Sequence, residues 1–326
     1  MKKVFITGGM GFIGRNLVKK LLNETDYHLD ILDNLSSSLV SDELLNNPRI
    51  NFIESDFSAW EVPEDANYDQ IYHLAGPVGP VRVLEFSGRI AQIIVSQLYK
   101  AADMAIAMGA KLMFISTSEV YGEHVTEGTP ETVSSVVPSD VTVRLEYGVS
   151  KLIGEIILKN LSRVSDLKYN CVRPFNIVGP GQNGKGGFVI PRFLEKAQAG
   201  EPITVYNEGN MVRAFTHVED FVNALYSIME SEVFGEVFNI GNAENTITIL
   251  ELAKKVKEAT NTSSEIIHVD PKKLYGDDFE EAWDKIPNVD KLVNMIGWKA
   301  EKSVDDIIRE IVELGESKEP TQDFSI

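Results

Sequence analysis

A glycine-rich turn near the N-terminus constrains the fold of this chain more than any other feature. An apolar segment at residues 4–7 runs directly into the sequence T-G-G-M-G-F-I-G, and an amphipathic segment at residues 12–23 follows it. Glycines spaced as G-x-G-x-x-G allow a tight turn, a close approach of the backbone to a pyrophosphate, and close packing of a helix on a strand. The pattern predicts a strand, a phosphate-binding turn and a helix whose N-terminus faces the anion.

Short apolar segments alternate with amphipathic segments along the first half of the chain. Strands buried on both faces of a parallel sheet are short and apolar, so this alternation predicts a doubly wound α/β fold. The expected strands are 4–7, 29–32, 50–53, 71–75, 112–116 and 169–172, and the expected helices are 12–23, 87–108 and 147–161.

The rhythm changes after residue 174. Glycine and proline crowd residues 179–191, which predicts a long and functional loop. We expect a Rossmann-type α/β dinucleotide-binding domain over residues 1–174, to which segments near 214–241 return, and a smaller α/β substrate-binding domain over residues 175–326. The expected helices after this point are 192–199, 218–229, 248–260 and 304–314, and the expected strands are 203–205, 236–240 and 265–268.

Charge and composition argue against several kinds of partner. The chain has 31 Lys+Arg against 49 Asp+Glu, a formal net charge of −18, which disfavours nucleic acid and anionic membranes. It has no apolar run of the roughly 18 residues that a membrane span requires. The N-terminus lacks a secretory pattern and the single Cys171 can form no internal disulfide, so we expect a cytoplasmic protein. His73, His124 and His217 lack metal-ligand spacing, so no metal is expected.

An acidic residue lies where the ribose of a dinucleotide would need it. Asp33 ends the second expected strand, 19 residues after Gly14. A carboxylate at this spacing accepts hydrogen bonds from ribose hydroxyls, which favours NAD over NADP, and Asn34 in place of a basic residue points the same way. Asp56, after the third strand, is either an adenine contact or a solvated loop carboxylate.

A tyrosine and a lysine lie one helical turn apart in the helix expected at 147–161. Tyr147 and Lys151 are spaced i, i+4, so their side chains share one face of the helix. A nearby ammonium and the positive nicotinamide both stabilise a phenolate, so we expect them to bring the pKa of Tyr147 nearer to the working pH and to make Tyr147 a general base.

The segment S-T-S-E-V-Y-G, residues 116–122, supports this interpretation. It follows an expected strand, at the edge where open α/β sheets bind their ligands. Thr117 would hydrogen-bond the substrate there, and Glu119 would act as a base or an orienting group. Ser118 is also readable as a residue that caps the strand end.

Seven motifs occur in an order typical of one enzyme family. They are T-G-G-M-G-F-I-G (7–14), L-D-N-L (32–35), H-L-A-G (73–76), S-T-S-E-V-Y-G (116–122), Y-G-V-S-K (147–151), R-P-F-N-I-V-G-P (173–180) and R-A-F-T-H-V-E-D (213–220). The closing segment I-G-W-K-A-E-K-S-V-D-D-I-I (296–308) extends the pattern. Over nearly its whole length the chain resembles the extended short-chain dehydrogenase/reductases, which include sugar-nucleotide epimerases, dehydratases and decarboxylases.

The resemblance implies roles for individual residues. NAD would be held by Gly8, Gly11, Phe12, Ile13, Gly14, Asp33, Asn34, Asp56, Phe57, Leu74, Ala75, Gly76, Tyr147 and Lys151. The catalytic residues would be Thr117, Ser118, Glu119, Tyr147 and Lys151. The substrate, a nucleoside-diphosphate sugar, would contact Asn176, Gly187, Phe188, Val189, Arg192, Tyr206 and Arg213. A homodimer would form through the helices expected at 87–108 and 147–161.

The resemblance also implies chemistry at carbon 4 of the sugar. Oxidation to a 4-keto sugar permits inversion by a 4-epimerase, loss of carbon dioxide by a decarboxylase, or loss of water by a 4,6-dehydratase. The segments T-S-E (117–119) and H-L-A-G-P-V-G-P (73–80) are similar to those of UDP-glucuronate decarboxylases, so decarboxylation is the expected reaction. A chain that kept only the fold would instead be a dinucleotide-sensing scaffold.

One segment departs from the decarboxylase pattern. After Pro80 the decarboxylases have a tyrosine and then an asparagine, whereas this chain reads V-R-V-L-E-F-S-G-R. Arg82, Arg89 and Arg144 are alternative candidates for a carboxylate clamp, and each is also readable as a solvated charge.

Overall fold

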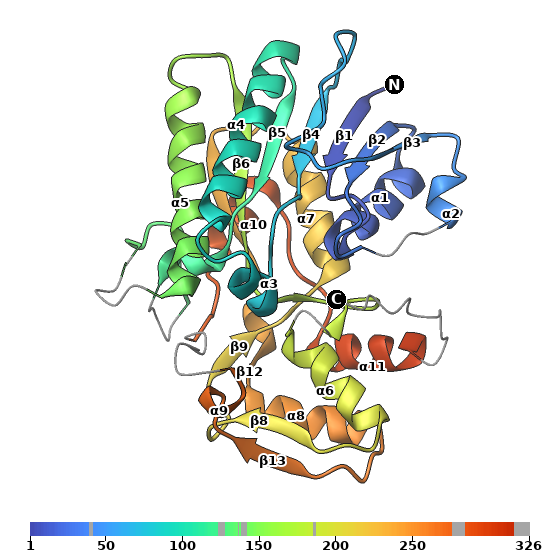
Figure 1. Cartoon of the computed structure of the whole chain (residues 1–326), viewed down its shortest axis with the longest axis vertical. Helices are drawn as coiled ribbons and strands as arrows, with labels where there is room; N and C mark the ends of the chain where they lie inside the picture. The colour runs from blue at the N-terminus through green and yellow to red at the C-terminus, as the bar shows by residue number, and fades with distance from the viewer. Residues whose placement is uncertain are drawn as a thin grey trace.

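A seven-stranded parallel sheet forms the centre of the molecule (Figure 1). The computed structural model describes residues 1–38, 42–122, 128–135, 137, 142–184, 187–275 and 284–315. The strands lie in the order β11-β6-β5-β4-β1-β2-β3, and every neighbouring pair is parallel. Their bounds are β1 Lys3–Thr7, β2 His28–Asp33, β3 Ile50–Glu54, β4 Gln70–His73, β5 Lys111–Ile115, β6 Lys168–Pro174 and β11 Glu236–Ile240. The predicted doubly wound, Rossmann-type α/β fold is confirmed.

Helices cover both faces of this sheet. Successive residues of a strand point to opposite faces, so Val4 and Ile6 of β1 belong to one hydrophobic core and Phe5 to another. The covering helices are α1 Phe12–Glu24 and α7 Val218–Glu230 on the first face, and α4 Ile90–Met108 and α5 Val143–Leu161 on the second. No helix in the described part of the chain is long and apolar enough to cross a bilayer.

Several expected helices have different bounds in the structure; the helix expected at 192–199, for example, begins at Val189. The helix expected at 87–108 is preceded by a separate short helix, α3 (Pro80–Glu85), and α4 begins only at Ile90. Gly88 lies between them with φ +77°, a left-handed conformation that interrupts a helix. The helix α5 begins at Val143, four residues before the expected start, and a short helix α2 (Asp42–Leu45) was not expected.

A smaller unit lies below the sheet in Figure 1 and has its own hydrophobic core. Its parallel pair is β8 Ile203–Tyr206 with β13 Ile266–Val269, covered by α6 Val189–Gln198, α8 Ile249–Ala259 and α11 Val304–Gly315. The remaining strands and α-helices of the described chain are β7 Ile177–Val178, β9 Val212–Ala214, β10 Thr216–His217, β12 Thr246–Thr248, α9 Lys272–Tyr275 and α10 Asp290–Ile296. The strand β11 pairs with β6 of the main sheet. The division of the chain at residue 174 stays a prediction.

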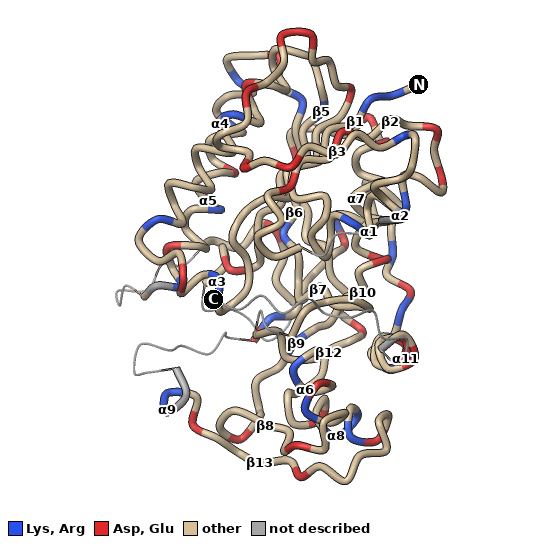
Figure 2. The backbone as a smooth tube through the Cα atoms, turned by 45° about the vertical axis from the view of Figure 1, so that its right-hand side comes forward, with Lys and Arg blue, Asp and Glu red and all other residues tan. Residues whose placement is uncertain are grey.

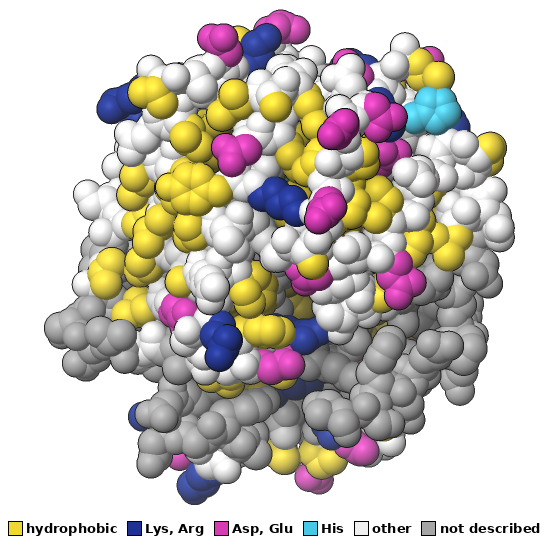
Figure 3. Space-filling view, turned by 45° about the horizontal axis from the view of Figure 1, so that its top comes forward, with side chains coloured by type: hydrophobic (Ala, Val, Ile, Leu, Met, Phe, Trp, Pro, Cys, Tyr) yellow, Lys and Arg dark blue, Asp and Glu magenta, His cyan; other side chains and the backbone are white. Residues whose placement is uncertain are grey.

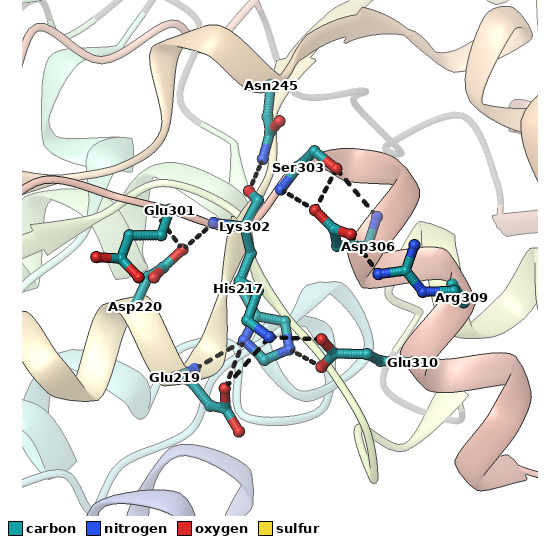
Figure 4. Close-up of polar contacts among 10 residues, drawn as sticks. All are labelled: His217, Glu219, Asp220, Asn245, Glu301, Lys302, Ser303, Asp306, Arg309 and Glu310. Carbon is teal, nitrogen blue, oxygen red and sulfur yellow. Dashed lines mark hydrogen bonds and ion pairs between the residues drawn. The ribbon is translucent and has the colours of Figure 1, made fainter.

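Polar contacts fasten the C-terminal segment to α7 (Figure 4). The Asp220 carboxylate accepts hydrogen bonds from the backbone N–H groups of Glu301 and Lys302 at 3.2 and 3.0 Å. Asn245 donates to the Lys302 carbonyl at 2.8 Å. Because the side chain of Asp220 is buried, these bonds hold the start of the C-terminal helix in a fixed position.

One group of described side chains has the spacing of metal ligands: His217, Glu219 and Glu310 (Figure 4). Nδ1 of His217 accepts the Glu219 N–H at 3.1 Å, so a neutral ring carries its proton on Nε2, which lies 3.2 Å from a Glu310 oxygen. The Lys302 ammonium is 2.6 Å from the other Glu310 oxygen and supplies the positive charge. The group is therefore explained as a helix cap with an ion pair.

Candidate active site

The turn between β1 and α1 has the shape that a pyrophosphate requires. The Gly11 N–H donates to the Gly8 carbonyl at 3.1 Å, and Gly8 has φ +70°, which glycine adopts without strain. A Cβ atom on Gly14 would lie 2.2 Å from the Gly8 carbonyl oxygen, so only glycine permits this approach of the helix to the turn. Phe12 and Ile13 open α1, whose first N–H groups have no partner within the helix. These residues fit the pyrophosphate of NAD.

Asp33 ends β2 and is tied to this turn. Its carboxylate accepts hydrogen bonds from the Met10 N–H at 3.0 Å, from the Leu35 N–H at 2.8 Å and from the Ser38 hydroxyl at 3.1 Å. These bonds fix the carboxylate beside the glycine turn, on the side of the sheet where the ribose is predicted to lie.

Asn34 and Asp56, which are predicted to face the adenosine, lie side by side. Asn34 Nδ2 donates to Asp56 Oδ2 at 3.0 Å, and Asp56 Oδ1 accepts from the Ser58 N–H at 2.8 Å. The ring of Phe57 is buried, with its centroid 6.0 Å from that of Phe5. The Phe57 side chain therefore packs in the core beneath this edge.

The segment Leu74–Gly76 follows β4 and adjoins the glycine turn. The Ala75 N–H donates to Thr7 Oγ1 at 3.2 Å, and the same nitrogen would lie 2.8 Å from a Cβ atom on Gly8. The parallel pairing of β1 with β4 produces this contact. The structure thus brings the residues predicted to line the cofactor to one edge of the sheet.

His73 supports the end of β1 as a neutral ring. Its Nδ1 is 2.8 Å from Thr7 Oγ1. Burial and the charge of Lys151 lower the pKa of His73 to about 3. The sequence analysis assigned no role to this histidine apart from rejecting it as a metal ligand.

Tyr147 and Lys151 lie on one face of α5, and both side chains are buried. The Lys151 ammonium donates to the Ile115 carbonyl at 2.8 Å and lies 6.0 Å from the centroid of the Tyr147 ring. Burial lowers the pKa of Lys151 to about 8. Burial also raises the pKa of Tyr147, and a hydrogen bond with Thr117 only partly opposes the rise. The expectation that Lys151 and the positive nicotinamide together bring this pKa nearer to the working pH stays a prediction.

Glu119 lies in the short 3-10 turn Ser118–Tyr121, after β5, and is held between two cations. Arg144 Nε and Nη2 donate to its two carboxylate oxygens at 2.7 and 2.6 Å, and the Lys285 ammonium donates to one of them. Burial by itself would raise the pKa of Glu119, but the charges of Lys285 and Arg144 hold that pKa well below its usual range. So weak a base is better suited to orienting other groups than to proton abstraction. Burial lowers the pKa of Lys285 to about 8. The sequence analysis did not find Lys285, and Ser118 is buried beside this group.

The residues predicted to bind substrate form two groups. Arg192 of α6 lies over the ring of Tyr206, with Cζ 4.3 Å from the ring centroid, and donates to its hydroxyl. Arg213 of β9 is bridged through its backbone to Lys285, so it adjoins the Glu119 group. Asn176 has φ +43° and donates to the last carbonyl of β9 at 3.0 Å.

Gly187, Phe188 and Val189 lead into α6 and lie beside α3. A Cβ atom on Gly187 would be 3.4 Å from the side chain of Val81, and Gly187 itself has φ +81°. Residues 185 and 186 of the loop predicted at 179–191 lie outside the described residues.

The three alternative arginines have different positions. The Arg144 guanidinium binds Glu119 near Tyr147. Arg82 instead donates to the Ser36 carbonyl, on the dinucleotide side, and Arg89 is exposed. Of the three, Arg144 alone is placed beside Tyr147.

A buried ion pair lies beneath α5. Glu155, eight residues after Tyr147 on α5, accepts hydrogen bonds from Arg173 Nε at 2.9 Å and Nη2 at 2.6 Å, and from the Ser116 hydroxyl. The Arg173 guanidinium also lies 4.7 Å from the Tyr121 ring centroid. This pair was not predicted from the sequence, although the i+8 spacing places Glu155 on the same helix face as Tyr147 and Lys151.

The fold and the site together define an NAD-dependent enzyme of the short-chain dehydrogenase/reductase type. The model of the NAD dependent epimerase/dehydratase family matches residues 4–241, and the chain belongs to this family. NAD is therefore its cofactor.

Known proteins similar to the chain act on sugar nucleotides. It is 32% identical over 319 residues to UDP-N-acetyl-alpha-D-glucosaminuronate decarboxylase of Bacillus cytotoxicus, which covers 96% of this chain and 97% of the relative. It is 30% identical over 299 residues to UDP-glucuronic acid decarboxylase 5 of Arabidopsis thaliana, which covers 91% of this chain and 84% of the relative. The crystal structure of UDP-glucose 4-epimerase from Thermotoga maritima with UDP-glucose superimposes with a TM-score of 0.84 at 28% identity, over 97% of this chain and 99% of the other.

Proposed function

We propose that this enzyme decarboxylates a UDP-linked uronate, such as UDP-glucuronate or its 2-acetamido counterpart, through a 4-keto sugar. The observation that carries the proposal is the group of cations beside Tyr147, in which Arg144 and Lys285 share the single carboxylate of Glu119. The two decarboxylases to which the chain is similar act on substrates of this kind.

The cations of this group favour an acidic sugar. Arg144 and Lys285 both bind the Glu119 carboxylate, and Arg213 adjoins them. A sugar carboxylate bound beside these cations would gain charge-assisted hydrogen bonds, which a neutral hexose could not form. Ser118 stands where many dTDP-glucose-type dehydratases have an aspartic acid that protonates the leaving hydroxyl, which disfavours that kind of dehydration. Some other dehydratases also have Thr-Ser-Glu at these positions.

The described residues have distinct roles in such a reaction. Bound NAD would accept hydride from carbon 4 of the sugar and later return it. Tyr147 takes the proton of the 4-hydroxyl, Thr117 hydrogen-bonds the same oxygen, and Lys151 stabilises the phenolate. The 4-keto group is then β to the carboxylate, so the bond between carbon 5 and the carboxylate carbon breaks, releasing carbon dioxide and leaving an enolate. A proton is added to carbon 5, and the Tyr147 phenol returns its proton as the ketone is reduced.

The test is product analysis by mass spectrometry with UDP-glucuronate, UDP-N-acetylglucosaminuronate, UDP-glucose and dTDP-glucose. We expect the mass of carbon dioxide to be lost from a uronate substrate only. An isomer of unchanged mass would identify a 4-epimerase, and loss of water from dTDP-glucose would identify a 4,6-dehydratase. Bound NAD without any turnover would identify a dinucleotide-sensing scaffold. Each of these three results would overturn the proposal.

Two variants test the assigned residues. Tyr147→Phe should abolish turnover and keep NAD bound, because it removes the base and keeps the ring. Arg144→Gln should raise KM for the uronate, whereas Arg163→Gln, an exposed arginine just after α5, is the matched control and should leave KM unchanged. Equal KM values in the two arginine variants would show that Arg144 does not bind the carboxylate.

We also propose a homodimer formed by α4 and α5. Tyr99 of α4 and Ile153 and Ile156 of α5 are 45%, 41% and 52% exposed. Hydrophobic side chains gather on the left of Figure 3, the side on which these helices lie in Figure 1. Light scattering should give twice the chain mass for the native protein and the chain mass for Ile156→Lys; a monomeric native protein would refute the assignment.

A further inference from the structure

The helix α3 lies beside the dinucleotide-binding edge of the sheet. It follows β4 through residues 74–79, a connection with two glycines in left-handed conformations, Gly76 at φ +147° and Gly79 at φ +92°. The first part of this connection touches the glycine turn, because Ala75 adjoins Gly8. The side chain of Val81 adjoins Gly187 of the smaller unit. The helix thus lies between the cofactor edge and the segment that is predicted to bind substrate.

Arg82 of α3 reaches across this edge. Its Nη2 donates to the Ser36 carbonyl, in the connection that follows β2. In the sheet β1 lies between β4 and β2. Arg82 follows β4 and contacts the segment after β2, so its side chain crosses the carboxyl end of β1. The glycine turn lies at that end. The Ser38 hydroxyl, two residues beyond Ser36, is 4.0 Å from the position of a Cβ atom on Gly11.

The contacts of Arg82 leave part of its donor set available. Nη1 is 3.2 Å from the Glu85 carboxylate, Cζ is 5.7 Å from the Phe86 ring centroid, and Nη2 bonds Ser36. A guanidinium has five N–H donors. Within the described part of the chain, two are used in hydrogen bonds, and the Glu85 side chain is 55% exposed, so that ion pair is weak.

The negative charge of the chain makes a cation at the position of Arg82 useful for binding a pyrophosphate. Acidic positions are spread over both units in Figure 2, and the net charge is −18. Asp33 and Asp56 lie on the adenosine side of the glycine turn. The pyrophosphate of a dinucleotide therefore enters a negative field, and neutral backbone N–H groups alone do not offset it.

We propose that Arg82 is a cofactor-binding residue whose guanidinium crosses the glycine turn and neutralises the pyrophosphate of bound NAD. It holds the dinucleotide from the side of α3, opposite the N–H groups of α1. A charge-assisted bond of this kind gives roughly 10- to 100-fold tighter binding. The inference rests on NAD being the cofactor, and it does not depend on which sugar nucleotide is the substrate.

The test measures binding to the whole enzyme freed of nucleotide, without turnover. Isothermal titration with NAD, ADP-ribose and adenosine is compared for the native protein, Arg82→Ala, Arg82→Lys and the control Arg89→Ala, an exposed arginine seven residues further on. We expect Arg82→Ala to weaken the binding of NAD and of ADP-ribose by the same 10- to 100-fold factor and to leave the binding of adenosine unchanged. Arg82→Lys should recover part of the lost affinity, and Arg89→Ala should have no effect.

Two outcomes would overturn the proposal. Unchanged NAD affinity in Arg82→Ala would show that the guanidinium does not meet the cofactor. An equal loss of affinity for adenosine and for ADP-ribose would show that Arg82 acts by shaping the segment after β2. Loss of NAD binding in the native protein would count against the cofactor assignment itself, which keeps the two failures distinguishable. Melting temperatures measured without nucleotide should agree among the variants, because Arg82 lies at the surface edge and not in a core.

Discussion

Removing one partner of the buried ion pair between Glu155 and Arg173 should destabilise the protein strongly, because it leaves the other partner buried without its counter-charge. Both side chains are nearly inaccessible, at 6% and 8% exposure, and the pair is bidentate at 2.9 and 2.6 Å. Arg173 Nη1 is buried without a hydrogen-bond partner among the described residues, so this guanidinium already depends on Glu155 for most of its compensation. Glu155→Gln would leave the cation buried beside a neutral amide, at a cost of about 3–5 kcal/mol.

A double-mutant cycle measures this effect. Urea unfolding, followed by circular dichroism and by fluorescence, gives the free energies of unfolding of Glu155→Gln, Arg173→Met and the double variant. We expect the double variant to lose less stability than the two single variants added together, by about 2–4 kcal/mol, because it buries no unpaired charge. The control is Glu201→Gln in the exposed Lys196–Glu201 pair, which should cost less than about 1 kcal/mol. Additive losses, or a loss as small as that of the control, would refute the reasoning.

Three other substitutions test the site. Lys151→Met should abolish turnover and raise stability at pH 7 by up to about 3 kcal/mol, because folding lowers the pKa of this ammonium from 10.5 to about 8; the gain should fade as pH rises from 8 past 10.5, where the unfolded chain also loses the proton. Gly14→Ala should cost about 1–3 kcal/mol of stability and weaken NAD in calorimetry, since its Cβ would lie 2.2 Å from the Gly8 carbonyl oxygen. His73 stays neutral when folded, so the unfolded state takes up an additional proton as pH falls from 6.5 toward 3; His73→Asn should therefore flatten the loss of stability measured over that range.

Local patterns were sufficient for the parts of the site that lie within one strand, turn or helix. The glycine turn follows from the need for backbone without Cβ atoms at a tight approach, and the Cβ position of Gly14 bears this out. The common face of Tyr147 and Lys151 follows from helical spacing alone. The helix expected to begin at residue 87 begins at Ile90, because Gly88 adopts a left-handed conformation that interrupts a helix.

Contacts between distant segments could not be obtained in this way. Lys285 meets Glu119 across 166 residues of sequence, and no local pattern marks either as the partner of the other. The pKa of Tyr147 depends on burial, which its spacing from Lys151 does not report. Glu155 is an intermediate case, because the helical spacing places it correctly but does not identify Arg173 as its partner.

The buried charges around the ends of β5 and β6 differ in one respect that bears on catalysis. Arg144 and Lys285 are paired with Glu119, and Arg173 is paired with Glu155. Within the described residues, Lys151 faces a neutral carbonyl and has no carboxylate partner. Its positive charge is therefore uncompensated, which agrees with the lowering of its pKa by burial. Loss of the Tyr147 proton would create an anion close to this ammonium. Burial opposes deprotonation of the phenol, but the ion pair between the phenolate and Lys151 favours it.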